Sequence, residues 1–578
     1  MCISMTNLKI DGIAVEVPDG STILQAAQAA GINLPTLCYH PDQAVKANCR
    51  ICVCEVEGQR LLQAACSTPV TGGMVVRTNS AKVLKARRMI LKLILAHHPQ
   101  DCLNCIRNQN CELQTLVEEY GIRDNPFELK LKGYDEDNST MAVVRDQDKC
   151  IVCRRCVETC SVVQTVNALC VEGRGPGVMV TPVLGKSLAE TACIVCGQCI
   201  HACPVGAIHE HEQIDEFLAA VADPDKIVIT QIAPAVRVAI GDEVGMATGE
   251  MPMGKLVAGL RRIGIDYVLH TNFTADLTIL EEGNELLRRV KEGGKLPMFT
   301  SCSPGWINFC ETFFPDLLDN LSTCKSPQQM FGSLAKTYWA EKMEIDPSRI
   351  YSVSIMPCTA KKFEAARPEM NDSGFRDVDL VLTTREIGRL FRMFGTDFDK
   401  IEPSGFDSWM GKYTGAAVIF GATGGVMEAA LRTVYEVVTG ETLDDVNFTV
   451  VRGMEGIKEA TVNLAGLEVR VAVAHGLSNA RKVMDQVRAG ESPYHFVEIM
   501  CCPGGCIGGG GQPITKCNAK RAERIRGIYV EDEQCPIRKS HENPEVKQIY
   551  SDFLHEPLGH KSHQLLHTHY APKNKTIL

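Results

Sequence analysis

The sequence predicts a multidomain chain that combines α+β and α/β architecture, and three observations support this. Its 578 residues suffice for about four domains at roughly 150 residues each. Eighteen of the 27 cysteines lie before residue 204, so the front of the chain differs in chemistry from the rear. From about residue 225 onward, apolar runs of strand length alternate with helical patterns, which is typical of an α/β region with parallel strands.

Composition and charge exclude several broad classes of protein. The chain carries 60 basic and 70 acidic residues, so it lacks the basic surface typical of nucleic-acid binding. Its 27 cysteines are too sparse for a disulfide scaffold, which has about 8–10% cysteine in a short secreted chain. The apolar stretch 89–96 is interrupted by Lys92, so no membrane span is expected. The N-terminus lacks an export-signal pattern, which predicts a cytoplasmic protein.

Residues 1–82 predict a small α+β unit. Alternating apolar residues predict strands, and Ser21-Thr22 followed by apolar residues at helical spacing predicts a helix with Gly31 as its C-cap. The unit also contains four cysteines, namely Cys38, Cys49, Cys52 and Cys66. Their spacing is a longer-loop relative of the pattern in plant-type [2Fe-2S] ferredoxins. We therefore expect a [2Fe-2S] ferredoxin-like domain in which Cys54 packs elsewhere.

Residues 83–140 carry one histidine and three cysteines at short spacing, namely His98, Cys102, Cys105 and Cys111. Such a set satisfies zinc as well as an iron-sulfur cluster, and the spacing alone leaves both open. Because the set lies between two iron-sulfur modules, it resembles the distal [4Fe-4S] site of hydrogenases and of the respiratory complex I family. His97 is the competitor for His98, which fits the family spacing.

Residues 141–215 contain the most specific pattern in the chain. The spacing C-x2-C-x2-C-x3-C occurs twice, followed by Ser161 in the first run and by Pro204 in the second. It is typical of bacterial two-cluster ferredoxins, in which the fourth cysteine of each run binds the other [4Fe-4S] cluster. Zinc ribbons instead use two pairs of ligands. The expected ligand sets are Cys150, Cys153, Cys156 and Cys203 for one cluster, and Cys193, Cys196, Cys199 and Cys160 for the other.

Residues 216–578 predict an α/β unit, with strands expected at 226–230, 351–356, 416–420 and 469–474. Cys358 follows one of these strands, at the carboxyl edge where open α/β sheets bind ligands. Glycines surround two further cysteines and let the backbone approach a bulky cofactor closely. A flexible turn is the alternative for the glycines alone. The segments concerned are Thr300-Ser-Cys-Ser-Pro-Gly-Trp306, Met356-Pro-Cys-Thr-Ala-Lys-Lys-Phe-Glu364 and Glu498-Ile-Met-Cys-Cys-Pro-Gly-Gly-Cys-Ile-Gly-Gly-Gly-Gly-Gln-Pro513.

These three segments are similar to the signatures of [FeFe]-hydrogenases, and the resemblance extends over the whole chain, closest to the catalytic subunits of NAD(P)-reducing and electron-bifurcating enzymes. It implies an H-cluster, a [4Fe-4S] cubane joined to a diiron unit with CO, cyanide and a dithiolate. Residues 216–578 would be the H-cluster domain. Carried over by position, the cubane ligands are Cys358, Cys502 and Cys506. Lys361 would donate a hydrogen bond to a cyanide, and Ser326 and Met356 would line the diiron pocket.

The resemblance also implies a proton relay, since the proton released from H2 must leave a water-poor pocket. The relay residues are Cys302, Glu282, Ser322, Glu285 and Arg289. Glu282, Glu285 and Arg289 share one face of a predicted helix at positions i, i+3 and i+7. Without the resemblance, this spacing favours an ordinary solvated face with salt bridges.

One position departs from the family pattern. The signature has two adjacent cysteines, the first in the relay and the second a cubane ligand, whereas this chain has Cys302 and Ser303. Either Ser303 binds iron as an alkoxide or Cys302 becomes the ligand; loss of H2 activity is the third alternative. Cys501 stands where the signature has alanine. It joins a group of unassigned thiols that are expected to be inert and buried, namely Cys2, Cys170, Cys310, Cys324, Cys517 and Cys535.

The expected function is reversible oxidation of H2, with electrons passing through one [2Fe-2S] and three accessory [4Fe-4S] clusters. No G-x-G-x-x-G motif follows a strand, so NAD(P) and flavin sites are expected on partner subunits, with ferredoxin as a further partner. The diiron unit requires maturation proteins. The segment 562–570 resembles the family's tail and is expected to be an amphipathic docking tail rather than a metal site. The alternative function is an H2 or redox sensor or an iron-sulfur carrier, suggested by Ser303.

Overall fold

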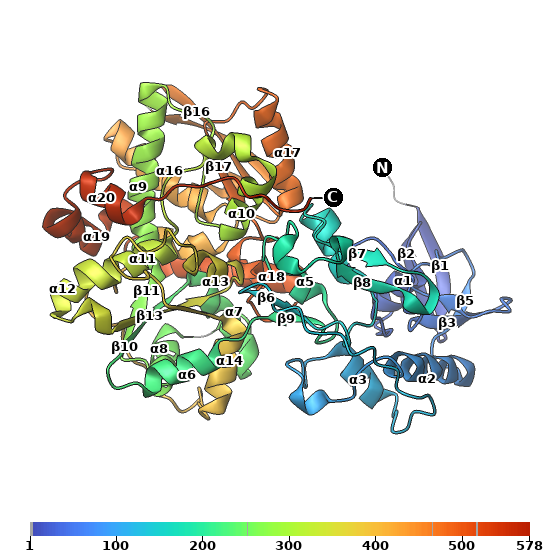
Figure 1. Cartoon of the computed structure of the whole chain (residues 1–578). Helices are drawn as coiled ribbons and strands as arrows, with labels where there is room; N and C mark the ends of the chain where they lie inside the picture. The colour runs from blue at the N-terminus through green and yellow to red at the C-terminus, as the bar shows by residue number, and fades with distance from the viewer. Residues whose placement is uncertain (1–3, 251, 465, 516–517, 578) are drawn as a thin grey trace.

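The computed structural model describes residues 4–250, 252–464, 466–515 and 518–577. A large α/β body forms one side of the molecule, and the front units extend from it as an arm (Figure 1). Within the described residues, no helix is long and apolar enough to cross a membrane.

The first unit is a five-stranded sheet in the order β2-β1-β5-β3-β4, with one helix against it. The helix begins after Thr22, whose side chain accepts a hydrogen bond from the Gln25 N–H, and its C-cap is Ala30. Gly31 follows at φ 73°, a conformation that glycine adopts without strain, so the predicted C-cap lies one residue too late. The elements are β1 Met5–Ile10, β2 Ile13–Pro18, α1 Ile23–Ala29, β3 Val53–Val56, β4 Gln63–Ala64 and β5 Val75–Arg77.

The second unit consists mainly of two helices, α2 Ala81–Leu95 and α3 Glu112–Glu119, with a 3-10 turn at Cys102–Asn104. The buried Arg87 of α2 holds this unit to the first, because its guanidinium donates to the Val53 carbonyl at 2.8 Å. The same guanidinium donates to the Tyr120 hydroxyl at 3.0 Å, which ties α2 to the end of α3.

The third unit repeats one loop conformation twice. In each cysteine run, the residue before the second cysteine and the residue after it have positive φ: Val152 and Arg154 in one run, Val195 and Gly197 in the other. Each loop therefore curls in the same way around its own cysteines. Two short antiparallel pairs frame the loops. The elements are β6 Val143–Arg145, α4 Arg155–Glu158, β7 Leu169–Glu172, β8 Met179–Pro182, α5 Gln198–Ala202 and β9 Ile208–Glu210.

The body contains two four-stranded sheets. The first, in the order β11-β10-β13-β14, is entirely parallel; the second, β12-β17-β16-β15, is parallel except for the β15–β16 pair. Each of the three signature segments contains the carboxyl end of a strand or follows it directly: the first begins after β12, and the other two begin within β13 and β17. The strands are β10 Ile227–Ile232, β11 Tyr267–His270, β12 Met298–Phe299, β13 Ile350–Met356, β14 Leu380–Thr383, β15 Ile457–Leu464, β16 Leu467–His475 and β17 Phe496–Met500.

Helices cover both sheets, and α9 is the longest of those described (Figure 1). Up to β13 they are α6 Ile214–Ala222, α7 Pro234–Val244, α8 Met253–Arg262, α9 Thr271–Glu292, α10 Pro304–Phe313, α11 Pro327–Leu334 and α12 Ala340–Met343. The later helices are α13 Ala360–Ala365, α14 Thr384–Met393, α15 Gly415–Val418, α16 Gly425–Thr439, α17 Leu477–Arg488, α18 Asn518–Gln534, α19 Pro544–Ile549 and α20 His560–Leu566.

The predicted strand at residues 416–420 is wrong. This segment forms α15 and a 3-10 turn, Ile419–Gly421, and is buried on all sides. A short, fully buried apolar run lacks the polar positions that distinguish helical from strand periodicity, so the sequence pattern could not separate the two. The other three predicted strands are confirmed as β10, β13 and β16.

After α20 the chain runs back across the body to the third unit (Figure 1). There the Ala192 N–H donates to the Thr576 carbonyl at 3.0 Å. On the way, Lys573 forms an ion pair of 2.7 Å with Glu311 of α10. The C-terminal segment therefore straps the body to the unit that carries the two cysteine runs.

Candidate functional site

The three signature segments meet at one cavity between the two sheets. Its lining is rich in sulfur, since each segment contributes at least one cysteine. The lining includes Cys302 and Ser303 from the first segment, Cys358 from the second, and Cys501, Cys502 and Cys506 from the third.

The thiols of Cys358, Cys502 and Cys506 interact electrostatically with one another across the cavity. Burial raises the pKa of Cys506 to about 12, and it also raises the pKa of Cys358. Thiols in such surroundings stay protonated without a metal, whereas thiolates are the soft donors that iron-sulfur clusters require. A group of three converging thiols in an apolar cavity therefore suits an iron-sulfur cubane, and the donor set fits the cofactor that the resemblance implies.

Close backbone packing explains most of the glycines in the third segment. Gly505 and Gly509 line the cavity, as expected for a close approach to a cofactor. Gly510 instead contacts the third unit: a Cβ added there would lie 2.4 Å from the Cys196 carbonyl oxygen and 2.7 Å from Gly197 Cα. These glycines therefore also bring two backbones together, which the sequence did not reveal.

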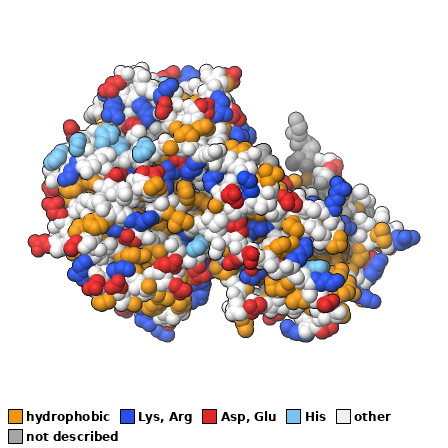
Figure 2. Space-filling model, viewed as in Figure 1, with side chains coloured by type: hydrophobic (Ala, Val, Ile, Leu, Met, Phe, Trp, Pro, Cys, Tyr) orange, Lys and Arg blue, Asp and Glu red, His pale blue; other side chains and the backbone are white. Residues whose placement is uncertain are grey.

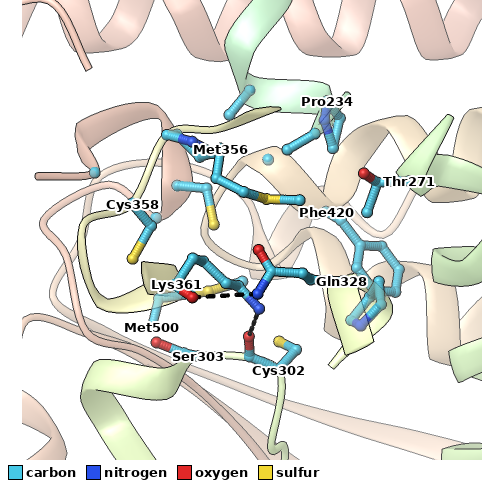
Figure 3. A pocket seen from close by; sticks show the side chains of 18 of the residues that line it. Pro234, Thr271, Cys302, Ser303, Gln328, Met356, Cys358, Lys361, Phe420 and Met500 are labelled. Carbon is cyan, nitrogen blue, oxygen red and sulfur yellow. Dashed lines mark hydrogen bonds between the residues drawn. The ribbon is translucent and has the colours of Figure 1, made fainter. Parts of the chain in front are cut away.

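Lys361 is buried at the cavity wall and points toward the first signature segment (Figure 3). Its ammonium donates to the Cys302 carbonyl at 3.2 Å and to Glu364 Oε2 at 2.9 Å. The Ser326 hydroxyl also donates to Glu364, at 2.8 Å. Ser326 is not among the described lining residues, whereas the predicted lining residue Met356 is among them and its thioether projects into the cavity (Figure 3).

Sequence reasoning missed several residues that shape the cavity. Gln328, which donates to Glu364 at 3.1 Å, lines it together with Thr271 and Phe420. Glu364 holds Lys361, Gln328 and Ser326 at once, and its place in the second signature was the signal that could have identified it. Gln328 and Phe420 lie outside all three signatures, so the sequence carried no comparable signal for them.

Beside the cavity, Glu282 of α9 is 2% exposed, and the structure places it within electrostatic reach of the Cys302 thiol. Burial, together with the nearby Glu285, raises the pKa of Glu282 to about 8. Its Oε1 has no hydrogen-bond partner among the described residues, while Ser322 and the Ser301 backbone bond to its carboxylate. Glu282 is therefore a buried acid that gains and loses a proton close to neutral pH.

From Glu282 the polar groups continue outward. The Ser322 hydroxyl donates to Glu285 Oε2 at 2.8 Å, and Arg289 donates to Glu285 Oε1 at 2.6 Å. Glu285 is 2% exposed, so the interpretation of this helix face as a solvated one is wrong: α9 is covered by the segment around Ser322. Hydrogen bonds thus link four of the five predicted relay residues, from Glu282 through Ser322 and Glu285 to Arg289, and the Cys302 thiol lies within electrostatic reach of Glu282.

The histidine-rich tail lies on the body next to α9. Leu565 and Leu566 of α20 are buried, and histidine side chains gather over α19 and α20 on the surface (Figure 2). His567 contacts Glu281 Oε2 at 3.2 Å and the Thr323 hydroxyl at 2.8 Å. The amphipathic tail therefore docks onto its own chain.

In the third unit, the two expected ligand sets line two separate cavities. One is lined by Cys150, Cys153, Cys156 and Cys203. The other is lined by Cys160, Cys193, Cys196 and Cys199. The exchange of the fourth cysteine between the runs, which the spacing predicts, is thus reproduced in the grouping of the sulfurs.

In the first unit, the four predicted cysteines form two hydrogen-bonded pairs that interact with each other, Cys38 with Cys49 and Cys52 with Cys66. The bond from Cys49 lowers the pKa of Cys38 to about 5. The thiol of Cys54 faces away and donates to the Gln63 carbonyl at 3.6 Å.

In the second unit, His98 is buried and His97 is exposed. The Nδ1 atom of His98 has no hydrogen-bond partner among the described residues. His98 shares a cavity with Cys102 and Cys111. Cys105 lies against the third unit, because a Cβ added at Gly206 would be 2.6 Å from its sulfur.

The third unit is bonded directly to the cavity segments. His201 Nε2 lies 2.8 Å from the Gly509 carbonyl, and Gln198 donates to the Gly508 carbonyl at 2.9 Å. Gln164 donates to the Cys501 carbonyl at 3.1 Å. The third unit has two sets of cysteines. The set that adjoins the cavity consists of Cys160, Cys193, Cys196 and Cys199.

Of the unassigned thiols, Cys310 and Cys324 are buried, as expected, whereas Cys170 and Cys535 are half-buried. Cys2 and Cys517 lie outside the described residues.

Family models confirm the predicted kinds of domain. They match a 2Fe-2S iron-sulfur cluster binding domain at residues 4–81, an NADH-ubiquinone oxidoreductase-G iron-sulfur binding region at 87–126 and a 4Fe-4S binding domain at 189–209. Residues 226–510 match the C-terminal domain of the iron only hydrogenase large subunit, and 518–573 match the iron hydrogenase small subunit.

Two curated proteins are similar over almost the full length, and a solved structure is similar over part of it. The NADP-reducing hydrogenase subunit HndD of Solidesulfovibrio fructosivorans is 50% identical, covering 99% of this chain and 100% of the relative. Iron hydrogenase 1 of Clostridium pasteurianum is 40% identical, covering 98% and 100%. The structure of a variant of apo [FeFe]-hydrogenase HydA1 from Chlamydomonas reinhardtii has a TM-score of 0.57 at 44% identity, covering 62% of this chain and 98% of that one.

Proposed function

The chain belongs to the iron-only hydrogenase family, and on this premise we propose that it catalyses the reversible oxidation of H2 at an H-cluster held in the cavity where the three signature segments meet. Cys358, Cys502 and Cys506 would bind the cubane part of that cofactor. When bound, the diiron part supplies the site at which H2 is cleaved into protons and electrons. The protein's own contribution is to hold this group in a dry cavity and to move protons and electrons away from it.

Lys361 positions the cofactor in this proposal. Its ammonium is fixed by Glu364 and by the Cys302 carbonyl, so a second partner in the cavity would receive a charge-assisted hydrogen bond of fixed direction. Since Glu364 in turn holds Ser326 and Gln328, a single buried carboxylate orients one wall of the site. We assign Ser326 this supporting role rather than direct contact with the diiron unit.

Protons leave the cavity through the series that begins at Cys302. Glu282 accepts a proton from that thiol, because its raised pKa of about 8 lets it change charge near neutral pH. Ser322 passes the proton to Glu285 by rotating its hydroxyl, and Arg289 holds Glu285 at the outer end. Each transfer links neighbouring groups, so no bulk water is needed inside the body.

Electrons leave through the cluster sets of the third unit and then through those of the second and first units. The relative from Solidesulfovibrio fructosivorans is named an NADP-reducing hydrogenase subunit, and this chain contains no nucleotide-binding motif after a strand. We propose that separate flavin and iron-sulfur subunits accept the electrons and reduce NADP, with ferredoxin as a further acceptor, in the cytoplasm.

One observation carries the proposal: three segments that are far apart in the sequence bring their cysteines to one cavity, which adjoins both the buried Glu282 and a set of four cysteines in the third unit. The test is H2 production from reduced methyl viologen by the chain matured with the diiron unit, beside the variant Cys358→Ala. We expect turnover by the native chain and none by the variant. If the matured native chain carries the full H-cluster and remains inactive, the alternative of a sensor or iron-sulfur carrier replaces the proposal.

A further inference from the structure

Two departures from the family signatures lie side by side in the folded chain. Ser303 replaces a cysteine in the first signature and Cys501 replaces an alanine in the third, 198 positions later. The Cys501 N–H donates a hydrogen bond of 3.3 Å to the Ser303 hydroxyl oxygen, and both residues line the same cavity. One cysteine has thus been lost and another gained at the same place in the structure.

The Cys501 thiol lies over the first turn of α10, the helix that follows Ser303. A Cβ added at Gly305 would be 2.8 Å from Cys501 Sγ. The thiol of Cys501 therefore lies beside the backbone of the helix that begins directly after Ser303.

The number of thiols in the two neighbouring sets indicates which cluster Cys501 would bind. The thiol is in hydrogen-bonding contact with Cys196 on one side and with Cys502 on the other. Cys196 belongs to a set of four that already suffices for its cluster, so a fifth thiol there is surplus. On the other side, the cubane set of Cys358, Cys502 and Cys506 is one thiolate short. The surplus thiol lies next to the incomplete set.

Cys302 also lies near the cubane set, because it packs in the same core group as Cys506 and its thiol interacts electrostatically with that residue. Cys501 and Cys502 pack together in the group that adjoins Cys196. The Cys302 thiol is close to Glu282, and the Cys302 carbonyl accepts from Lys361. Moving Cys302 into the cubane set would break the start of the proton relay, which Cys501 leaves intact.

Resting on the proposed function, we propose that Cys501 supplies the fourth thiolate of the cubane, so that the ligand lost at Ser303 is replaced from the third signature segment. A thiolate is a softer donor than the serine alkoxide and matches iron in a sulfide cluster. Ser303 then supports the ligand by accepting the Cys501 N–H. Gln164 adds a donor on the other side, with its amide 3.8 Å from Cys501 Sγ.

The experiment uses the full chain produced without diiron maturation, so that it carries iron-sulfur clusters only. Iron content, EPR and Mössbauer spectra are compared for the native chain, Cys501→Ala, Ser303→Ala and Ser303→Cys/Cys501→Ala. We expect Cys501→Ala to lose about one to four irons per chain, with the cubane signal replaced by that of a three-iron cluster or absent. Ser303→Ala keeps the signal, and the double variant restores it. Cys310→Ala, another buried cysteine, is the matched control and keeps every signal.

Retention of a four-iron cubane by Cys501→Ala overturns the proposal, and so does its loss in Ser303→Ala while the accessory signals persist. If Cys501→Ala fails to fold, the double variant decides, because it carries the same alanine with the ligand returned to position 303. Folded protein without the cubane in that variant also overturns the proposal. The hydrogenase proposal is tested separately by turnover of the matured native chain, so the two failures are distinguishable.

Discussion

The front units and the body obtain their chemistry in different ways. In the front units, each sulfur set comes from one continuous stretch of chain or from two short cysteine runs, and the loop conformation of these runs repeats at Val152 and Val195. In the body, the sulfurs come from three segments that only the two sheets bring together. Spacing along the chain therefore identifies a site formed by local loops, whereas a site formed by the fold requires the structure.

The ionisable groups beside the cavity mark the second difference. The body places Glu282, Glu285 and Lys361 in its interior, each held by specific partners. Such groups are costly to bury and are found where they are used. We expect substitutions in the body to change turnover strongly, whereas substitutions in the front units should change only the route of the electrons.

The largest effect is expected for Glu282→Gln. The amide cannot carry a proton between Cys302 and Ser322, so H2 production from reduced methyl viologen should fall by about 10²-fold or more. Iron content and the cubane EPR signal should stay unchanged. Glu281→Gln is the matched control, since Glu281 is its neighbour on α9 but bonds to Tyr550 at 2.6 Å rather than to the relay. An equal loss in both variants would show that the effect is structural.

The same variant should also change how stability depends on pH. Glu282 has a pKa of about 8 in the folded chain against an ordinary value of 4.5. Below pH about 4.5 both states bind the proton; between 4.5 and 8 only the folded state keeps it, so this group progressively lowers the free energy of unfolding as pH rises. Glu282→Gln removes that loss. Urea unfolding at pH 5 and pH 8 measures the free energy of unfolding of both proteins. The value for the variant minus the value for the native chain should be more positive at pH 8 than at pH 5, by about 1 kcal/mol or more. A difference that is equal at both pH values would contradict the raised pKa.

A moderate effect is expected where the two regions touch. Gly510→Ala forces a Cβ to within 2.4 Å of the Cys196 carbonyl oxygen, and we expect a loss of about 1–3 kcal/mol in the free energy of unfolding. Gly405→Ala is the control, because an added Cβ there meets nothing within 4 Å. Denaturant titration of both variants measures the difference, and equal stabilities would show that the contact is loose.

The smallest effect on turnover is expected at the far end of the front units. Cys66→Ser should remove the [2Fe-2S] cluster yet leave methyl viologen activity within about threefold of the native value, since the dye can reach other clusters. Reduction of NADP through partner subunits should fall much further. If dye-driven turnover collapses as well, the front units are not an independent module.

The sequence predicted the front clusters and the kinds of domain because their information is local. It also predicted β10, β13 and β16, which are long or flanked by clear turns. It failed at residues 416–420, where complete burial removes any periodicity. It misjudged the face of α9, because the segment that covers Glu285 lies more than thirty residues further along the chain.

Within the site, motif residues such as Cys358 and Lys361 were identified in advance. Gln328 and Phe420 were not, because their importance lies only in where the fold places them. The adjacency of Ser303 and Cys501 is of the same kind. The sequence showed that each of them departs from its signature. It did not show that they are neighbours, because they lie 198 positions apart.

The backbone contact between Gly197 and Gly510 has a consequence for electron tunnelling. Tunnelling rates fall steeply with the gap between carriers, and here the two chain segments that enclose neighbouring sulfur sets approach backbone to backbone, with the Thr359 side chain beside the contact. These glycines hold the gap close to the minimum that a polypeptide permits. When such a catalytic body is fused to a different electron-carrying module, this joint is the part of the interface that must be copied first.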